Sequence, residues 1–169
     1  MKILPVAKFI AVGIVLLFVV AKGCSYFDEY WYEGFLPDSV EVDKALYVAS
    51  SGGFGEGCGV AIYKIDAKTS ERIRAKGIAA VQSSRKAKRH ENRLYSEWKE
   101  TPYVEPEPEG LLRSRWLSGL AQGCSDIPDD MNAAIYNAMK TPGSFYATAL
   151  ESGVIIFPKL GWIMFSHFG

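Results

Sequence analysis

Residues 9–21 constrain this chain most, because thirteen successive positions, FIAVGIVLLFVVA, carry neither a charge nor a strongly polar group. At about 1.5 Å per residue, a helix over this stretch is roughly 20 Å long, which is shorter than a hydrocarbon core of roughly 30 Å. Lys2 and Lys8 precede the stretch. A positive segment followed by a short apolar core is typical of a secretory signal.

The same stretch can be extended into a membrane span if Lys8 snorkels at one end and aromatic residues lie at the far interface. Those aromatic residues are Tyr26, Phe27, Tyr30, Trp31 and Tyr32. In both interpretations the lysines stay in the cytoplasm, so the body of the chain is exported. We therefore expect a bacterial inner-membrane protein whose domain faces the periplasm, with a lipoprotein or a secreted protein as alternatives.

Two cleavage sites underlie those alternatives. Residues 19–21, VVA, permit cleavage before Lys22, which would release a secreted protein. The tetrapeptide Ala21-Lys22-Gly23-Cys24 resembles the lipobox of bacterial lipoproteins. That resemblance implies lipidation of Cys24 at a new N-terminus.

The sequence divides into a signal or anchor segment (1–23), a juxtamembrane neck (24–43) and one α+β domain (44–169). The chain has 19 basic and 19 acidic residues, and leaving out Lys2, Lys8 and Lys22 gives the exported part a net charge of −3. Nucleic-acid binding usually requires a strongly basic face, so we expect no such partner. The expected partners are the membrane and an envelope protein.

The cysteines agree with export. Cys58 and Cys124 remain as a pair once Cys24 is set aside, and in an oxidising compartment we expect them to form a disulfide. Closing that loop would stabilise the fold by about 4 kcal/mol in the chain-entropy model. Two separate buried thiols are the alternative. We expect no metal or cofactor, because the sequence has no CxxC or HxxxH spacing and its only histidines are His90 and His167.

The pattern after the neck predicts a mainly antiparallel sheet of about five to six strands, covered by two helices. The strands are expected at 44–50, 60–65, 78–82, 144–150, 154–158 and 162–168. The helices are expected at 67–76, capped by Asp66, and from about 128 to 140, capped by Ser125 or Asp126. A further short helix or turn is expected at 110–122. Strand, helix and strand over 60–82 would permit a right-handed crossover.

Two segments suggest binding and have simpler interpretations. Five glycines at 52–59 suggest a phosphate loop, but the Gly-Lys-Ser/Thr ending is missing and a strand follows, so we expect a hairpin connection. A basic cluster could contact anionic headgroups or an acidic partner. Its members are Arg85, Lys86, Lys88, Arg89 and Arg93. We expect instead a solvated segment balanced by the acids that follow it.

No catalytic motif is present. A serine hydrolase lacks its G-x-S-x-G elbow, and we expect His167 to be a hydrogen-bonded core residue. Glu56 and Asp126 are the acids we would suspect first if a site exists. We therefore predict a membrane-tethered, extracytoplasmic accessory or interaction domain without enzymatic activity. The alternative is a small cell-envelope hydrolase that uses paired carboxylates.

Overall fold

A computed structural model describes residues 4–53, 56–103 and 125–168 of this chain. Its helices are α1 (Leu4–Glu33), α2 (Ala67–Lys76), the 3-10 helix η1 (Gly77–Ala80) and α5 (Asp129–Lys140). Its strands are β1 (Val42–Gly53), β2 (Glu56–Ile65), β3 (Lys99–Glu100), β4 (Phe145–Ala149), β5 (Ser152–Phe157) and β6 (Trp162–Phe168). The strands form one six-stranded sheet in the order β1-β2-β6-β5-β4-β3. The predicted α+β class is confirmed.

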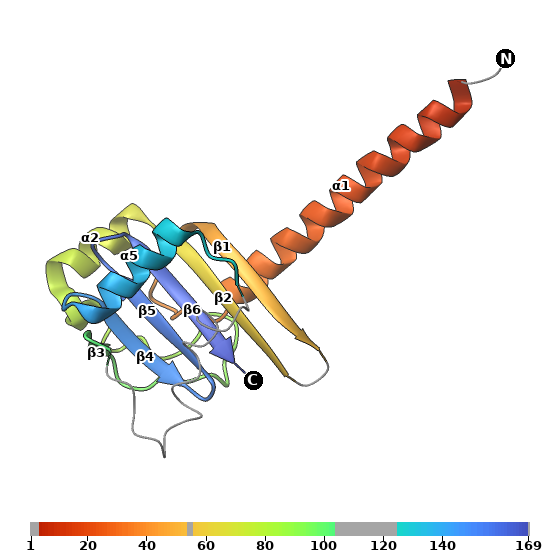
Figure 1. Ribbon diagram of the computed structural model, residues 1–169. Coiled ribbons are helices and arrows are strands. Elements are labelled where there is room, and N and C mark those ends of the chain that lie inside the picture. The colour runs from red at the N-terminus through yellow and green to blue at the C-terminus, as the bar shows by residue number, and fades with distance from the viewer. Residues whose placement is uncertain (1–3, 54–55, 104–124, 169) are drawn as a thin grey trace.

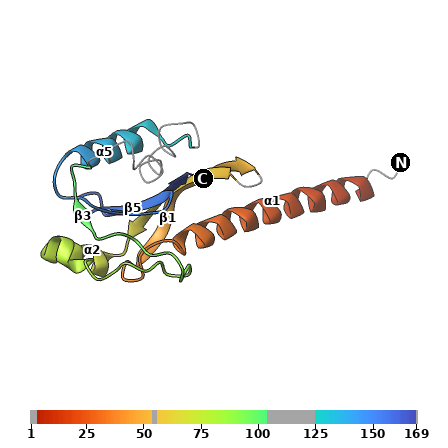
Figure 2. The same cartoon turned by 90° about the horizontal axis from the view of Figure 1, so that it is seen from below.

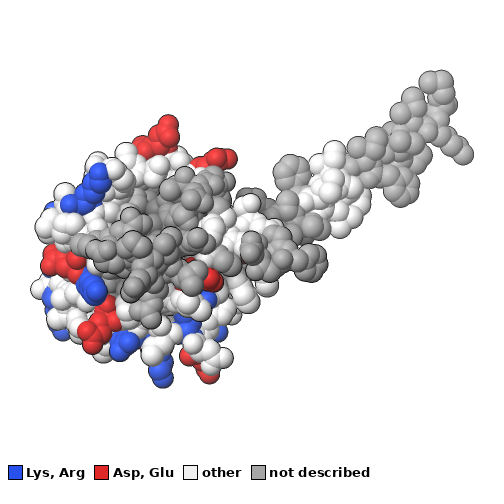
Figure 3. All heavy atoms as spheres, turned by 60° about the horizontal axis from the view of Figure 1, so that its bottom comes forward, with Lys and Arg blue, Asp and Glu red and all other residues white. Residues whose placement is uncertain are grey.

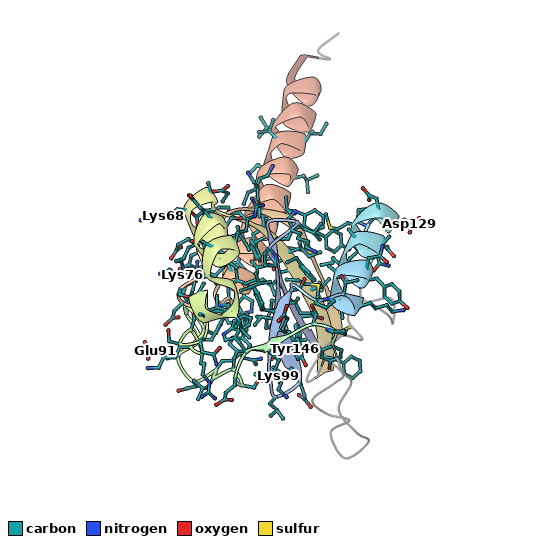
Figure 4. The ribbon with its side chains drawn as sticks, turned by 90° about the vertical axis from the view of Figure 1, so that its left-hand side faces the viewer. Lys68, Lys76, Glu91, Lys99, Asp129 and Tyr146 are labelled. Carbon is teal, nitrogen blue, oxygen red and sulfur yellow. The ribbon has the colours of Figure 1, made fainter. Side chains whose placement is uncertain are left out.

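The sheet has a covered layer on each face. Helix α5 lies on one face, and α2 with the C-terminal end of α1 lies on the other (Figures 1 and 2). Viewed from the side, α2 with Lys68 and Lys76 and α5 with Asp129 stand on opposite sides of the strands (Figure 4). Each layer closes over its own hydrophobic cluster, the larger of which contains Leu36, Tyr95 and Phe165.

The glycine-rich segment is part of a hairpin, as expected. Strands β1 and β2 are antiparallel, and their pairing continues to Gly53 opposite Glu56. Two register shifts interrupt β1, between Val42 and Lys44 and between Ala45 and Tyr47. A bulge of this kind bends and twists the strand locally.

Helix α2 has the predicted bounds because its ends are specified locally. The Asp66 carboxylate accepts hydrogen bonds from the backbone N–H groups of Lys68 (2.9 Å) and Thr69 (3.2 Å). The strand predicted at 78–82 is wrong: Gly77–Ala80 forms a 3-10 helix that continues from α2. Ile78 there packs against the larger cluster, so the apolar run is buried without a strand. The predicted crossover is therefore also wrong, and every strand pair is antiparallel.

Helix α5 begins without the predicted side-chain cap. Pro128 occupies the N-cap position and makes no capping hydrogen bond, so the prediction of Ser125 or Asp126 is wrong. The acidic Asp129 and Asp130 lie in the first turn instead, where negative charge is favourable. Buried Ile135 directs the helix onto the sheet.

The three C-terminal strands follow the prediction closely. Strand β6 lies between β2 and β5 and buries four successive residues, Ile163 to Ser166, PLACEHOLDER The two-residue strand β3 at the far edge was not predicted. The expected helix or turn at 110–122 lies outside the described residues.

Helix α1 runs without a break through the expected boundary at residue 23 and projects from the domain (Figure 1). The side chains at 4–11, 18–22 and 24 fall outside the description, and those at Val12 and 14–17 are largely exposed. Within the described residues, no helix is long and apolar enough to cross a membrane.

Candidate functional site

The described polar side chains gather where the end of α1 meets the sheet. Here Tyr32 is 6% exposed and Leu36 is fully buried, whereas Tyr26, Phe27, Tyr30 and Trp31 stay about half or more exposed. The predicted aromatic belt therefore loses Tyr32 to the core.

A row of small and polar residues crosses four neighbouring strands beneath this helix end. Ser50 of β1 is opposite Gly59 of β2, Gly59 is opposite His167 of β6, and His167 is opposite Ser152 of β5. The Tyr32 hydroxyl is hydrogen-bonded to His167 Nε2 at 3.1 Å. His167 is thus hydrogen-bonded, as expected.

Gly59 makes room for that contact. A Cβ atom added at Gly59 would approach the Tyr32 hydroxyl and His167 Nε2 to less than 3.0 Å. Any larger residue would fill the space that the tyrosine hydroxyl now occupies. The absence of a side chain at Gly59 therefore lets Tyr32 reach the sheet.

Burial keeps this pair neutral. It raises the pKa of Tyr32, against a smaller opposing effect of a hydrogen bond with Ser50. Burial also lowers the pKa of His167, and the positive charge of Arg93 lowers it further. The Arg93 guanidinium donates a hydrogen bond to Ser152 Oγ and lies over the Phe35 ring, 5.0 Å from its centroid.

Ion pairs hold the same helix end from the outside. Lys88 Nζ lies 3.2 Å from Glu33 Oε1 and 3.1 Å from Glu41 Oε2, and its side chain is only 11% exposed. Arg89 lies 3.7 Å from Glu33 Oε2 and donates a hydrogen bond to the Tyr30 carbonyl. Cations at a helix C-terminus also interact favourably with the helix dipole.

This arrangement changes the interpretation of the basic cluster. We expected the acids that follow it in sequence to balance it, but within the described residues Lys88 and Arg89 pair with acids that precede it. Arg85 Nε donates a hydrogen bond to the Tyr95 carbonyl at 2.8 Å. Most of the cluster is therefore used to join segments of the chain.

Tyrosine hydroxyls satisfy backbone carbonyls at the junction. Tyr63 donates to the Glu29 carbonyl and Tyr95 to the Phe35 carbonyl, each at 2.6 Å. Burial raises the pKa of both tyrosines, so both hydroxyls stay protonated. The last carbonyls of a helix lack partners within it, and these contacts supply some.

His90 completes the junction by stacking. Its ring centroid is 3.7 Å from that of Phe35 and 4.8 Å from that of Trp31. Gly34 allows this approach, since an added Cβ would lie 3.0 Å from His90 Nε2. Burial lowers the pKa of His90. Both histidines of the chain therefore lie where α1 joins the domain.

The residues singled out from the sequence do not assemble into a second site. Cys58 is 9% exposed in β2 opposite Phe168, and Cys124 lies outside the described residues, so the disulfide stays a prediction. The side chains of Cys24 and Glu56 fall outside the description, and Asp126 is exposed. Within the described residues, no group of three His, Cys, Asp or Glu side chains could hold a metal ion.

Sequence reasoning missed the Tyr32–His167 pair because 135 positions separate the two residues. The one available signal was the lone glycine at position 59, directly before an otherwise regular strand pattern. No family model, curated protein or solved structure matches this chain.

Proposed function

We propose that this protein is a membrane-tethered, extracytoplasmic accessory domain that α1 holds in a fixed orientation. The observation that carries the proposal is the continuity of α1 from Leu4 to Glu33, with an apolar N-terminal part and a C-terminal end bound to the sheet. A bilayer would cover the apolar part of the helix. The junction would then transmit the direction of the helix to the domain.

The surface supports the same proposal. The described atoms of the projecting stem carry no charge in the view of Figure 3, whereas basic and acidic groups alternate around the domain. The polar groups beneath α1 are engaged in holding the helix, which leaves Tyr32 and His167 with a structural role. An accessory role therefore fits the site better than the alternative, a hydrolase with paired carboxylates.

The test is a comparison of two arginine substitutions in the full chain. Leu17→Arg places a charge in the apolar stretch, and Leu150→Arg places the same charge on the domain at nearly equal exposure, 72% against 70%. We expect Leu17→Arg alone to lower the fraction that resists carbonate extraction, because a charged residue in a bilayer is costly. Equal retention of both variants would contradict the tether.

The side of the membrane needs a separate measurement. A phosphatase that is active only in the periplasm, fused after the last residue, should be active in cells. Mass spectrometry of the membrane fraction would then give the mature N-terminus and any acyl chain on Cys24. Phosphatase activity confined to the cytoplasmic side would overturn the extracytoplasmic assignment.

A further inference from the structure

The two edges of the sheet differ in a way that points to a binding surface. Strand β3 at one edge is two residues long, both charged and exposed, and Pro102 follows closely. Short charged strands and nearby prolines are how proteins protect an edge from added strands. Strand β1 at the other edge is twelve residues long.

Most of β1 lacks that protection. Its residues from Ala45 to Gly53 include neither a charge nor a proline. In the part of the chain that the structure describes, no strand pairs with the outer side of β1. The two register shifts lie near its start and leave 47–53 regularly paired with β2. An edge of this length presents a row of backbone donors and acceptors.

Helix α1 lies beneath this edge and projects past it (Figures 1 and 2). Contacts with the sheet show how it advances. The Tyr32 hydroxyl reaches His167 of β6, and the Glu29 carbonyl accepts from Tyr63 of β2. Tyr26 and Tyr30 line a hollow of about 170 Å³ together with residues 42–45 of β1.

The same progression gives the space beyond β1. A helix rises about 1.5 Å per residue and strands lie about 4.8 Å apart, so a helix that crosses strands advances by about three residues per strand. The next strand position therefore lies above Ser25 and Tyr26, both of which are exposed. The apolar stretch ends at Ala21, about six to eight further ångströms along the helix.

We infer that the outer edge of β1 binds an extended, basic segment of a partner protein as an additional strand lying across α1. Strand addition is an established mode of peptide recognition, in which backbone hydrogen bonds supply affinity. The inference rests on the proposed accessory role and names the kind of partner that role requires.

Charge supports a basic partner. Asp28 is exposed and Glu29 is partly exposed on this part of α1. Neither forms an ion pair within the described residues. A lysine or arginine in the added strand would find both carboxylates close to the position above Ser25. Complementary charges of this kind favour one register and one class of partner.

A second copy of this chain fits the edge poorly. Two β1 strands could pair only about a two-fold axis perpendicular to the sheet. Each projecting α1 would then enter the layer that the other copy fills with its own helix end and α2. A single extended segment avoids this collision.

The test uses the full chain in lipid nanodiscs and a defined peptide. The probe is a capped nine-residue peptide that alternates valine with threonine and carries one central lysine. One control peptide has glutamate in place of the lysine, and another is N-methylated on alternate residues, which removes donors along one edge. Binding is followed by fluorescence anisotropy, and the location of binding by amide hydrogen exchange.

We expect the lysine peptide to slow exchange in β1, between Ala45 and Ser51, and not in β3. Asp28→Asn with Glu29→Gln should weaken its binding about fivefold, since two partly exposed ion pairs are lost. Glu97→Gln with Glu100→Gln, at the protected edge, is the matched control and should leave binding unchanged.

Three results would overturn the inference. The first is unchanged exchange in β1 with saturating lysine peptide, and the second is equal binding of the N-methylated peptide. The third is a β1 edge whose amides are already protected without peptide, which would mean that the same chain or a second copy covers it. Because exchange reports on β1 and carbonate extraction reports on the tether, failure of one proposal is distinguishable from failure of the other.

Discussion

Gly59→Ala is the substitution that tests the junction most directly. The added methyl group would meet the Tyr32 hydroxyl and His167 Nε2 at less than 3.0 Å, so one of the three groups must move. Overpacking of this kind costs about 1–3 kcal/mol in the free energy of unfolding. No positive φ is involved at Gly59, so the cost would come from the contact and not from backbone strain.

A second substitution separates the contact from other effects. Tyr32→Phe removes the hydroxyl that the new methyl group would strike, together with its hydrogen bond to His167. Alone it should cost about 1–2 kcal/mol, because a half-buried acceptor loses its partner. In the double variant the methyl group occupies the vacated space, so the two costs should fall short of their sum by about 1 kcal/mol or more.

The assay is urea unfolding of the full chain in a mild detergent, followed by tryptophan fluorescence. Gly57→Ala is the matched control, because its added Cβ would have its nearest neighbour at 3.5 Å, an ordinary contact. We expect that variant to change the free energy of unfolding by less than about 0.5 kcal/mol. Additive costs in the double variant, or a Gly59→Ala variant as stable as Gly57→Ala, would refute this account of the junction.

Three further predictions concern charges elsewhere in the fold. Lys88→Met should cost about 1–3 kcal/mol in urea unfolding because it leaves the half-buried Glu33 carboxylate poorly compensated, whereas Lys64→Met breaks an exposed pair and should cost less than about 1 kcal/mol. Asp66→Ala should cost about 1 kcal/mol by removing the cap of α2, and Asp66→Asn should recover most of it in the same assay. Burial lowers the pKa of His167 in the folded state, so the unfolded chain binds more protons, and stability should fall as pH drops below about 6.5. Unfolding measured from pH 7.5 to 5 should show this loss, and a His167→Gln variant that keeps the full pH dependence would contradict it.

Local signals made much of the fold predictable. Helix α2 was placed correctly because Asp66 and Gly77 mark its ends within the sequence itself. The three C-terminal strands were found because short turns separate apolar segments. The run at 78–82 failed for a physical reason: a short apolar run is compatible with a strand or with one turn of helix, and only tertiary packing decides between them.

The candidate site was largely invisible to the same reasoning because its contacts are nonlocal. Lys88 pairs with Glu33 and Glu41, which lie 55 and 47 positions away. The acids nearest in sequence, which we expected to balance the basic cluster, therefore gave the wrong partners. Tyr32 was assigned to an aromatic belt because its neighbours are aromatic, and only the register of β2 with β6 shows where its hydroxyl goes.

A tether alone would not require such a junction. A flexible linker holds a domain near a membrane at little cost in specific contacts, yet here ion pairs, stacked rings and two tyrosine hydroxyls all act on one helix end. Such contacts fix a direction as well as a distance. A fixed direction matters when a binding surface must face a partner, and the open edge of β1 lies beside the helix as it leaves the domain. Loosening the junction by Gly59→Ala should therefore weaken peptide binding at β1 even though the substituted residue lies one strand away from that edge.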